Sequence, residues 1–126
     1  MLTEENVEQL VRGFLHEACG YLGINDSQIG IIYMPMPVQM MMVALLKDSD
    51  DIVIDNKLLA DVVEQNTYTK LRFEIYRVAR EIYQRRKHQA EGTQEDIKAD
   101  TNDAYAFAYA LIFLNGLSMI IPPADC

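Results

Sequence analysis

The stretch LRFEIYRVAR, Leu71–Arg80, lies at the centre of the longest helical pattern in the chain. Apolar side chains recur every three or four residues through this stretch and the next turn, at Leu71, Ile75, Val78 and Ile82. This spacing places them on one face of an α-helix. The sequence therefore predicts a long amphipathic helix that is capped by Thr67 or Thr69 and extends to about Lys87.

An N-terminal segment shows the same periodicity and predicts a first amphipathic helix. Its core face would carry Val7, Leu10, Val11, Phe14, Leu15, Ala18 and Leu22. Thr3 is the expected N-cap, and Gly20 and Gly23 would end the helix. His16 lies about half a turn from the middle of the apolar face, so we expect it to face water.

The segments between these two helices predict strands. Ile29–Met34 is rich in β-branched and aromatic residues and ends at a proline pair. Val38–Leu46 is compatible with a strand or a helix, and we interpret it as a strand because it lies between two clearer ones. Ile52–Asn56 reads as a short strand, and Lys57–Val63 as a single short helix.

The last predicted helix carries Ile97, Ala104, Phe107, Ala108 and Leu111 on one face, and its alternate alanines would let another helix approach closely. Residues 116–126 form a C-terminal tail. The predicted fold class is therefore α+β, with an N-terminal helix, a small, mainly antiparallel three-stranded sheet, a long central helix and a C-terminal helix. We expect residues 1–126 to form a single domain.

The composition limits the classes of function. The formal net charge is −8, which disfavours nonspecific nucleic-acid binding because that affinity comes from neutralised phosphates. The basic run Arg85–His88 is expected to be a solvated helix end. The apolar stretch Ile29–Leu46 is interrupted by prolines, so we expect no membrane span. No signal peptide and no disulfide framework are evident, so we expect a cytoplasmic protein.

Three segments, in this order, resemble compact gluzincin-type zinc metallopeptidases, especially the small bacterial and phage domains of the anti-repressor peptidase kind. They are IVIDNKLL at Ile52–Leu59, FEIYR at Phe73–Arg77 and TNDAYAFA at Thr101–Ala108. In that family the second segment carries H-E-x-x-H and the third supplies the last metal ligand. The resemblance implies a zincin-like fold for roughly residues 29–115.

The residues at the resembled metal site depart from the family pattern. Phe73 and Arg77 stand at the two histidine positions and Thr101 at the third-ligand position, and none of these three is a suitable zinc ligand. Only Glu74 matches, at the general-base position, and it has no metal-bound water to activate. The resemblance therefore implies a catalytically inactive metallopeptidase-like domain with no metal and no other cofactor.

The resemblance also implies that the helix face with Phe73 and Arg77 meets the last helix. We expect Phe73 to fill the former metal cavity and Arg77 to pair with Asp100, Asp103 or Glu74, because an unpaired buried guanidinium is costly. Two alternatives remain open. Asp100 would serve as the N-cap of the last helix, or the carboxylates Glu74, Asp100 and Asp103 would bind magnesium or calcium.

The expected function is that of a protein- or peptide-binding module that acts without nucleic acid or membrane. A peptide would add as a strand to Ile52–Ile54 or to Val38–Leu46, and the same unpaired edge would permit a homodimer. The alternatives are a metal-free enzyme that uses Glu74 as acid or base, and an unrelated α+β interaction domain.

Overall fold

The computed structural model describes residues 2–36 and 42–115, so the predicted tail and residues 38–41 of the predicted second strand lie outside the described residues. The helices and strands confirm the α+β class and the predicted order of elements. They are α1 (Glu4–Leu22), β1 (Ile31–Met34), β2 (Val43–Leu45), β3 (Ile52–Asp55), α2 (Asn56–Gln65), α3 (Thr69–Glu91) and α4 (Ile97–Asn115).

The three strands form a mixed sheet in the order β1-β3-β2. β2 pairs antiparallel with β3, and β1 pairs parallel with β3, with Ile31 opposite Ile52. Antiparallel pairing therefore holds for one of the two pairs. The expectation that Ile52–Ile54 offers a free edge was wrong, because β3 is the central strand and all four of its residues are buried.

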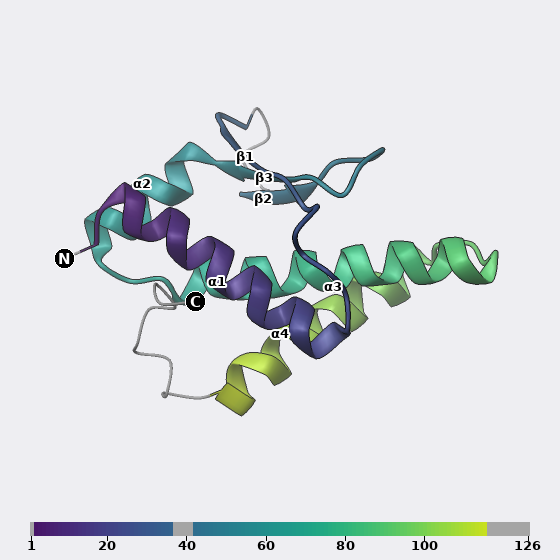
Figure 1. The fold of residues 1–126 in the computed structure, drawn as a ribbon. Coiled ribbons are helices and arrows are strands. Elements are labelled where there is room, and N and C mark those ends of the chain that lie inside the picture. Colours follow the sequence, from purple (N-terminus) through teal and green to yellow (C-terminus); the bar gives the residue numbers. More distant parts are fainter. Residues whose placement is uncertain (1, 37–41, 116–126) are drawn as a thin grey trace.

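α3 is the central element of the fold. It packs against α1, β2 and α4, and Figure 1 shows the sheet above α3 and α4 below it. The predicted core stripe of α3 is confirmed, since Leu71, Ile75, Val78 and Ile82 are fully buried. None of the described helices has the length and hydrophobicity needed to cross a membrane.

The ends of α1 follow the sequence prediction. The Thr3 hydroxyl accepts a hydrogen bond from the backbone N–H of Asn6, and the Asn6 side chain accepts one from the N–H of Thr3. This reciprocal pair satisfies two backbone donors of the first turn. Gly23 ends the helix in the left-handed conformation, at φ 70°. His16 faces water and pairs with Asp26 at 3.2 Å.

The predicted starts of α3 and α4 are shifted. Tyr68, not Thr67 or Thr69, occupies the N-cap position of α3, and its side chain makes no capping hydrogen bond. Asp96, not Asp100, caps α4, because its carboxylate accepts from the N–H of Ala99 at 3.1 Å. Ile97 was expected on the core face but is 78% exposed, since it lies in the first turn beyond the end of the core.

A buried polar contact that the sequence did not predict joins α1 to α3. The Arg72 guanidinium is 3.3 Å from the Glu17 carboxylate and 5.5 Å from the centre of the Phe14 ring. The fully buried Tyr76 donates its hydroxyl proton to Glu17 and accepts from Arg72. Burial, together with the bond to Glu17, raises the pKa of Tyr76, so Tyr76 stays protonated as a donor.

Candidate functional site

The face of α3 that carries Phe73 meets α4, as the resemblance implied. The Phe73 ring lies 4.7 Å from the ring of Tyr109 and 5.5 Å from that of Tyr105, measured between centroids. Aromatic pairs at these separations contribute about 0.5–1.5 kcal/mol beyond their buried area. The packing of Phe73 therefore helps to fix the position of the C-terminal half of α4 along the axis of α3.

Arg77 is buried and pairs within its own helix. Its Nε bonds to Glu74 at 2.7 Å and its Nη1 to Glu81, while Nη2 bonds to the carbonyl oxygen of Val43 at 2.9 Å. Glu74 is thus the one predicted partner that Arg77 contacts. Each of the three guanidinium nitrogens donates a hydrogen bond, which offsets much of the cost of burying a charge.

Burial and neighbouring charges shift the pKa values of Arg77 and Glu81. Burial acts to lower the pKa of Arg77, but Glu81 and Glu74 outweigh it, so the pKa is raised and the guanidinium stays charged. Burial raises the pKa of Glu81, with the like charge of Glu74 acting in the same direction and Arg77 in the opposite one. Glu81 therefore takes up a proton more readily than a solvent-exposed glutamate does.

Asp100 and Asp103 do not pair with Arg77, so that part of the prediction was wrong. Asp103 bonds to Arg80, and Asp100 accepts from His88 Nε2 at 2.9 Å. The cause is the alignment of the two antiparallel helices. Because Phe73 is opposite Tyr105 and Tyr109, the N-terminal turns of α4 lie beside α3 residues one to three turns beyond Arg77.

Two side chains of α3 and one of α4 converge at a single point. Arg80 Nε bonds to Asp103 Oδ2 at 2.7 Å, and Nη2 bonds to Oδ1 at 3.2 Å. The Gln84 amide donates to Asp103 Oδ2 at 2.8 Å and to the carbonyl oxygen of Asp100 at 2.7 Å. The hydrogen bond from Arg80, and next that from Gln84, lower the pKa of Asp103, so Asp103 stays ionised. We call Arg80, Gln84 and Asp103 the polar triad.

The sequence contained a signal for this triad that the first interpretation missed. Arg80-Glu81-Ile82-Tyr83-Gln84 has the i, i+1, i+4 spacing of H-E-x-x-H, seven residues after Phe73-Glu74-x-x-Arg77. Seven residues are close to two full turns, so both pentapeptides share one face of α3. Asp103 directly precedes Ala104, in the segment already compared with the family's third motif.

The polar triad does not fit a zinc ion. Arg80 stays protonated and repels a cation, and the Gln84 amide directs its N–H2 group at Asp103. The carboxylates Glu74, Asp100 and Asp103 are each bonded to a different side chain, Arg77, His88 and Arg80 respectively. Within residues 2–36 and 42–115 no three His, Cys, Asp or Glu side chains are grouped so that they could hold a metal ion.

A cleft of about 200 Å³ adjoins the triad. Its walls come from β2, the C-terminal half of α3 and the start of α4, and they include Leu45, Glu81, Gln84, Arg85, Asp100 and Thr101. Thr101, the predicted third-ligand position, is exposed and lines this cleft without contacting Phe73 or Arg77 in any described bond. Of the two glutamates bonded to Arg77, Glu81 lines the cleft and the predicted Glu74 does not.

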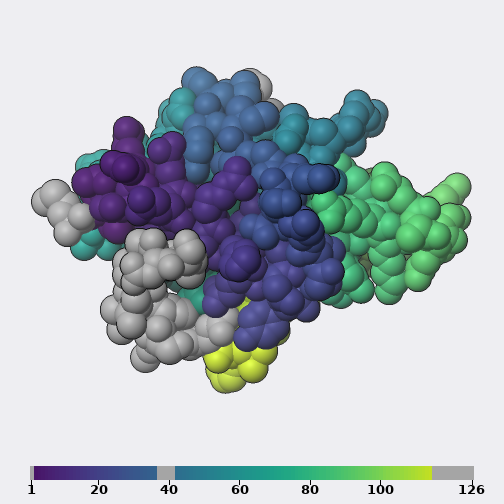
Figure 2. Space-filling model, in the orientation of Figure 1, coloured from purple at the N-terminus to yellow at the C-terminus, as the bar shows by residue number. Residues whose placement is uncertain are grey.

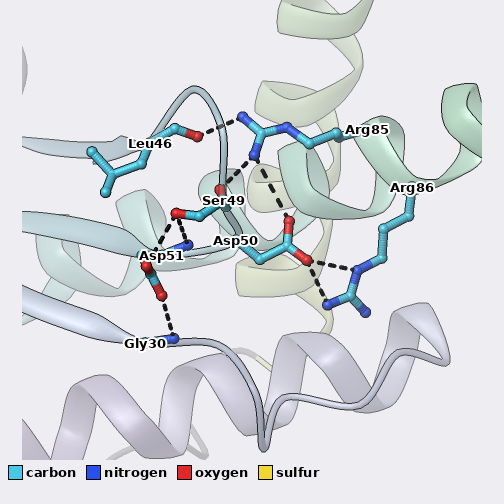
Figure 3. Close-up of polar contacts among 7 residues, drawn as sticks. All are labelled: Gly30, Leu46, Ser49, Asp50, Asp51, Arg85 and Arg86. Atoms are coloured by element: carbon cyan, nitrogen blue, oxygen red, sulfur yellow. Dashed lines mark hydrogen bonds and ion pairs between the residues drawn. The ribbon is translucent and has the colours of Figure 1, made fainter.

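The basic run at the end of α3 holds the turn between β2 and β3, which corrects its interpretation as a solvated helix end (Figure 3). Arg85 donates to the carbonyl oxygens of Ser49 at 2.5 Å and Leu46 at 2.7 Å. Arg86 bonds to the Asp50 carboxylate at 2.8 and 3.1 Å. These bonds fix the sheet relative to α3 and thereby shape one wall of the cleft.

Figure 3 also shows how the turn is joined to the start of β1. Asp51 Oδ1 accepts from the backbone N–H of Gly30 at 3.2 Å, and Asp51 Oδ2 accepts from the Ser49 hydroxyl at 3.0 Å. A β-carbon at residue 30 would lie 2.4 Å from Asp51 Oδ1. Glycine is therefore required for this close approach of strand and carboxylate.

β2 has one outer edge, and part of it is already bonded. The backbone N–H of Asp55 donates to Met42, and that of Leu46 donates to Asp51, so the even-numbered groups of β2 face β3. The odd-numbered groups, at Val43 and Leu45, therefore face outward. Arg77 occupies the Val43 carbonyl, whereas no described residue bonds to the backbone of Leu45 on that edge.

Comparisons with protein-family models, with curated proteins and with solved structures give no match to this chain.

Proposed function

We propose that this chain is a non-catalytic, metallopeptidase-like domain that acts in the cytoplasm as a protein- or peptide-binding module. The observation that carries the proposal is the polar triad. Arg80 and Gln84 stand at i and i+4 on α3 and meet Asp103 from α4. A zinc peptidase of the resembled kind needs two ligands with this spacing and a third from another element.

The polar triad would replace a metal ion in its structural role, which is to hold two elements of the fold together. A zinc ion with three protein ligands joins the elements that supply them, and here a bidentate ion pair and two amide hydrogen bonds join α3 to α4. The catalytic part would be lost, since no cluster among the described residues could hold a metal ion that lowers the pKa of a water molecule. Glu81, which follows Arg80 as the glutamate follows the first histidine of the motif, is held instead by Arg77.

The outer edge of β2 is the surface we propose for peptide binding. The Leu45 N–H and carbonyl face outward beside the cleft, and an extended peptide would pair with them as an added strand. Side chains of the added strand would alternate between the cleft and solvent. Arg77 bonds to the Val43 carbonyl and so limits how far the added strand can extend toward the start of β2.

A display experiment tests this proposal. A random heptapeptide library on phage is selected against the full chain, and enriched peptides are measured by fluorescence anisotropy. Leu45→Pro removes one outward-facing N–H and leaves the bonds to β3 in place. We expect it to weaken the selected peptides at least 10-fold. As a matched control, Ile32→Ala removes a side chain that is 39% exposed on the opposite edge strand and should leave affinity unchanged.

Two outcomes would overturn the proposal. Selection without enrichment, or peptides that bind the Leu45→Pro chain equally well, would exclude strand addition at β2. Cleavage of the bound peptides, with or without added zinc, would exclude a non-catalytic domain.

A second candidate is a metal-free acid–base enzyme, with Glu81 in place of the predicted Glu74. It is favoured by one observation, since Glu81 lines the cleft and burial raises its pKa. If the chain is such an enzyme, the rate of its reaction should follow the titration of Glu81, and the Glu81→Gln variant should be inactive. The binding proposal requires that Glu81→Gln retain peptide affinity.

A further inference from the structure

The C-terminal half of α4 is apolar on all sides. From Ala104 to Leu114 there are eleven consecutive residues without a charged side chain. Only one side of this segment is covered, because Ala104, Ala108 and Leu111 are buried, while Tyr109, Phe113 and Leu114 are 65%, 85% and 72% exposed. A helix that is apolar all round is normally buried on all sides. Figure 2 shows this end of α4, in yellow, at the lower edge of the molecule.

The uncovered side has a regular pattern of its own. Exposed residues follow one another at spacings of three, four, three and four, at Ala99, Asn102, Ala106, Tyr109 and Phe113. This is the spacing of the contact positions of a two-helix coiled coil. We call these five residues the outer seam. Contacts within the chain explain little of the pattern, since the buried residues of this segment are Ala104, Ala108 and Leu111, and of the seam only Tyr109 has a described ring contact, with Phe73.

One half of the outer seam, the small half, carries small side chains, and the other, the large half, carries large aromatic ones. Ala99, Asn102 and Ala106 occupy the first half, and Tyr109 and Phe113 the second. In an antiparallel pair of identical helices the large half of each would lie against the small half of the other. A second copy of this chain therefore matches the seam along its whole length, which a two-fold interface requires.

The exposed area of the seam fits a weak, transient dimer. With about 200 Å² of accessible surface for each large side chain, the exposed parts of Tyr109 and Phe113 amount to roughly 300 Å² per copy. Two copies would bury about 600 Å² from these side chains, in the range of weak interfaces below about 1,200 Å². Tyr109 is also held by Phe73, so little side-chain freedom would be lost on contact.

No charged residue belongs to the outer seam itself. Of the acidic residues near it, Asp103 is paired with Arg80, and Asp100 accepts a hydrogen bond from His88. The net charge of −8 on each copy acts over a longer range and would weaken association at low ionic strength.

We propose that two copies of this chain associate through the outer seam of α4, packed antiparallel. The inference is independent of the peptide-binding proposal, because the edge of β2 and the outer seam lie on different elements.

Sedimentation equilibrium of the full chain, from about 1 to 300 μM, tests the inference. The expected weight-average mass rises from 14.4 kDa toward twice that value, and the dissociation constant falls severalfold when sodium chloride is raised from 20 to 300 mM. Phe113→Glu should weaken the dimer at least 10-fold. Ile97→Glu is the matched control, since Ile97 is 78% exposed on the same helix but off the seam, and it should leave association unchanged.

Each other outcome overturns the inference. A monomer at all concentrations would mean that something other than a second copy covers the seam, such as residues 116–126 or a different protein. A dimer that Phe113→Glu does not weaken would place the interface on another surface, such as the edge of β2. Circular dichroism of both variants checks that the helices are retained.

Discussion

Arg80 and Asp103 bond through two separate pairs of atoms, from Nε to Oδ2 at 2.7 Å and from Nη2 to Oδ1 at 3.2 Å. This bidentate pair joins the middle of α3 to the second turn of α4. Gln84 adds a third bond to the same carboxylate. Two side chains of α3 thus hold the Asp103 carboxylate through three hydrogen bonds, at the position where our proposal places the zinc site of the resembled fold.

The Arg80–Asp103 pair should show measurable coupling. We expect Arg80→Met and Asp103→Asn each to lower the free energy of unfolding, and a double-mutant cycle to give a coupling energy of about 1 kcal/mol, at the upper end for partly exposed pairs. Urea unfolding of the four proteins measures it. Strictly additive effects would mean that the two groups stabilise the fold independently.

Asp103 should also give the chain part of its acid sensitivity. Its folded pKa is lowered, so the unfolded state binds the proton first as the pH falls. The stabilisation from Asp103 is therefore complete above the unfolded pKa of about 4 and is lost as the pH falls through the folded value. The stability difference between wild type and Asp103→Asn should be constant from pH 5 to 7 and shrink between pH 4 and 2. A difference that persists at pH 2 would contradict this account.

The two arginines that hold the β2–β3 turn should respond differently to salt. Arg85 donates to two backbone carbonyls and lies 3.8 Å from Asp50, beyond hydrogen-bond distance, whereas Arg86 bonds to the Asp50 carboxylate at 2.8 Å. We expect Arg85→Met to cost about 1.5–3 kcal/mol with little change in 1 M sodium chloride. Arg86→Met should cost less than about 1 kcal/mol, and its effect should fall in salt. Thermal melts at two ionic strengths compare them, and equal salt dependence would refute the assignment.

Gly30 should not tolerate a side chain while Asp51 is present. Gly30→Ala places a β-carbon 2.4 Å from Asp51 Oδ1 and disturbs the bond to the Gly30 N–H, so we expect a loss of about 1–2 kcal/mol. In an Asp51→Ala background the same change should cost clearly less. Gly20→Ala is the control, because no atom lies within 4 Å of a β-carbon there and alanine favours a helix. Equal costs in both backgrounds would show that the clash is unimportant.

The elements that the sequence predicted correctly depend on local patterns. The core faces of α1 and α3 follow from apolar residues at helical spacing, and the Thr3 cap follows from side-chain chemistry within one turn. The central position of β3 also had a local signal, since three consecutive apolar residues, Ile52–Ile54, are typical of a strand that is buried on both faces.

The site residues were harder to predict because their partners are distant in the sequence. Two pentapeptides with the same spacing share one face of α3, and nothing within that helix distinguishes Arg77 from Arg80. Which of the two arginines pairs with Asp103 depends on the packing of Phe73 against Tyr105 and Tyr109. This packing places Asp103 beside Arg80. This alignment is a tertiary contact between two helices, so residue spacing within either helix does not contain it.

Zinc uptake by a pair of substituted chains tests the central claim most directly. Arg80→His with Gln84→His would set two imidazoles at i and i+4 beside Asp103, and Phe73→His with Arg77→His is the control with the same spacing one heptad earlier. Purified chains are dialysed against zinc, analysed for metal and melted with and without EDTA. The account predicts about one zinc per chain and a melting temperature raised by zinc for the 80/84 variant alone. Zinc bound only by the 73/77 variant, or by neither, would contradict it.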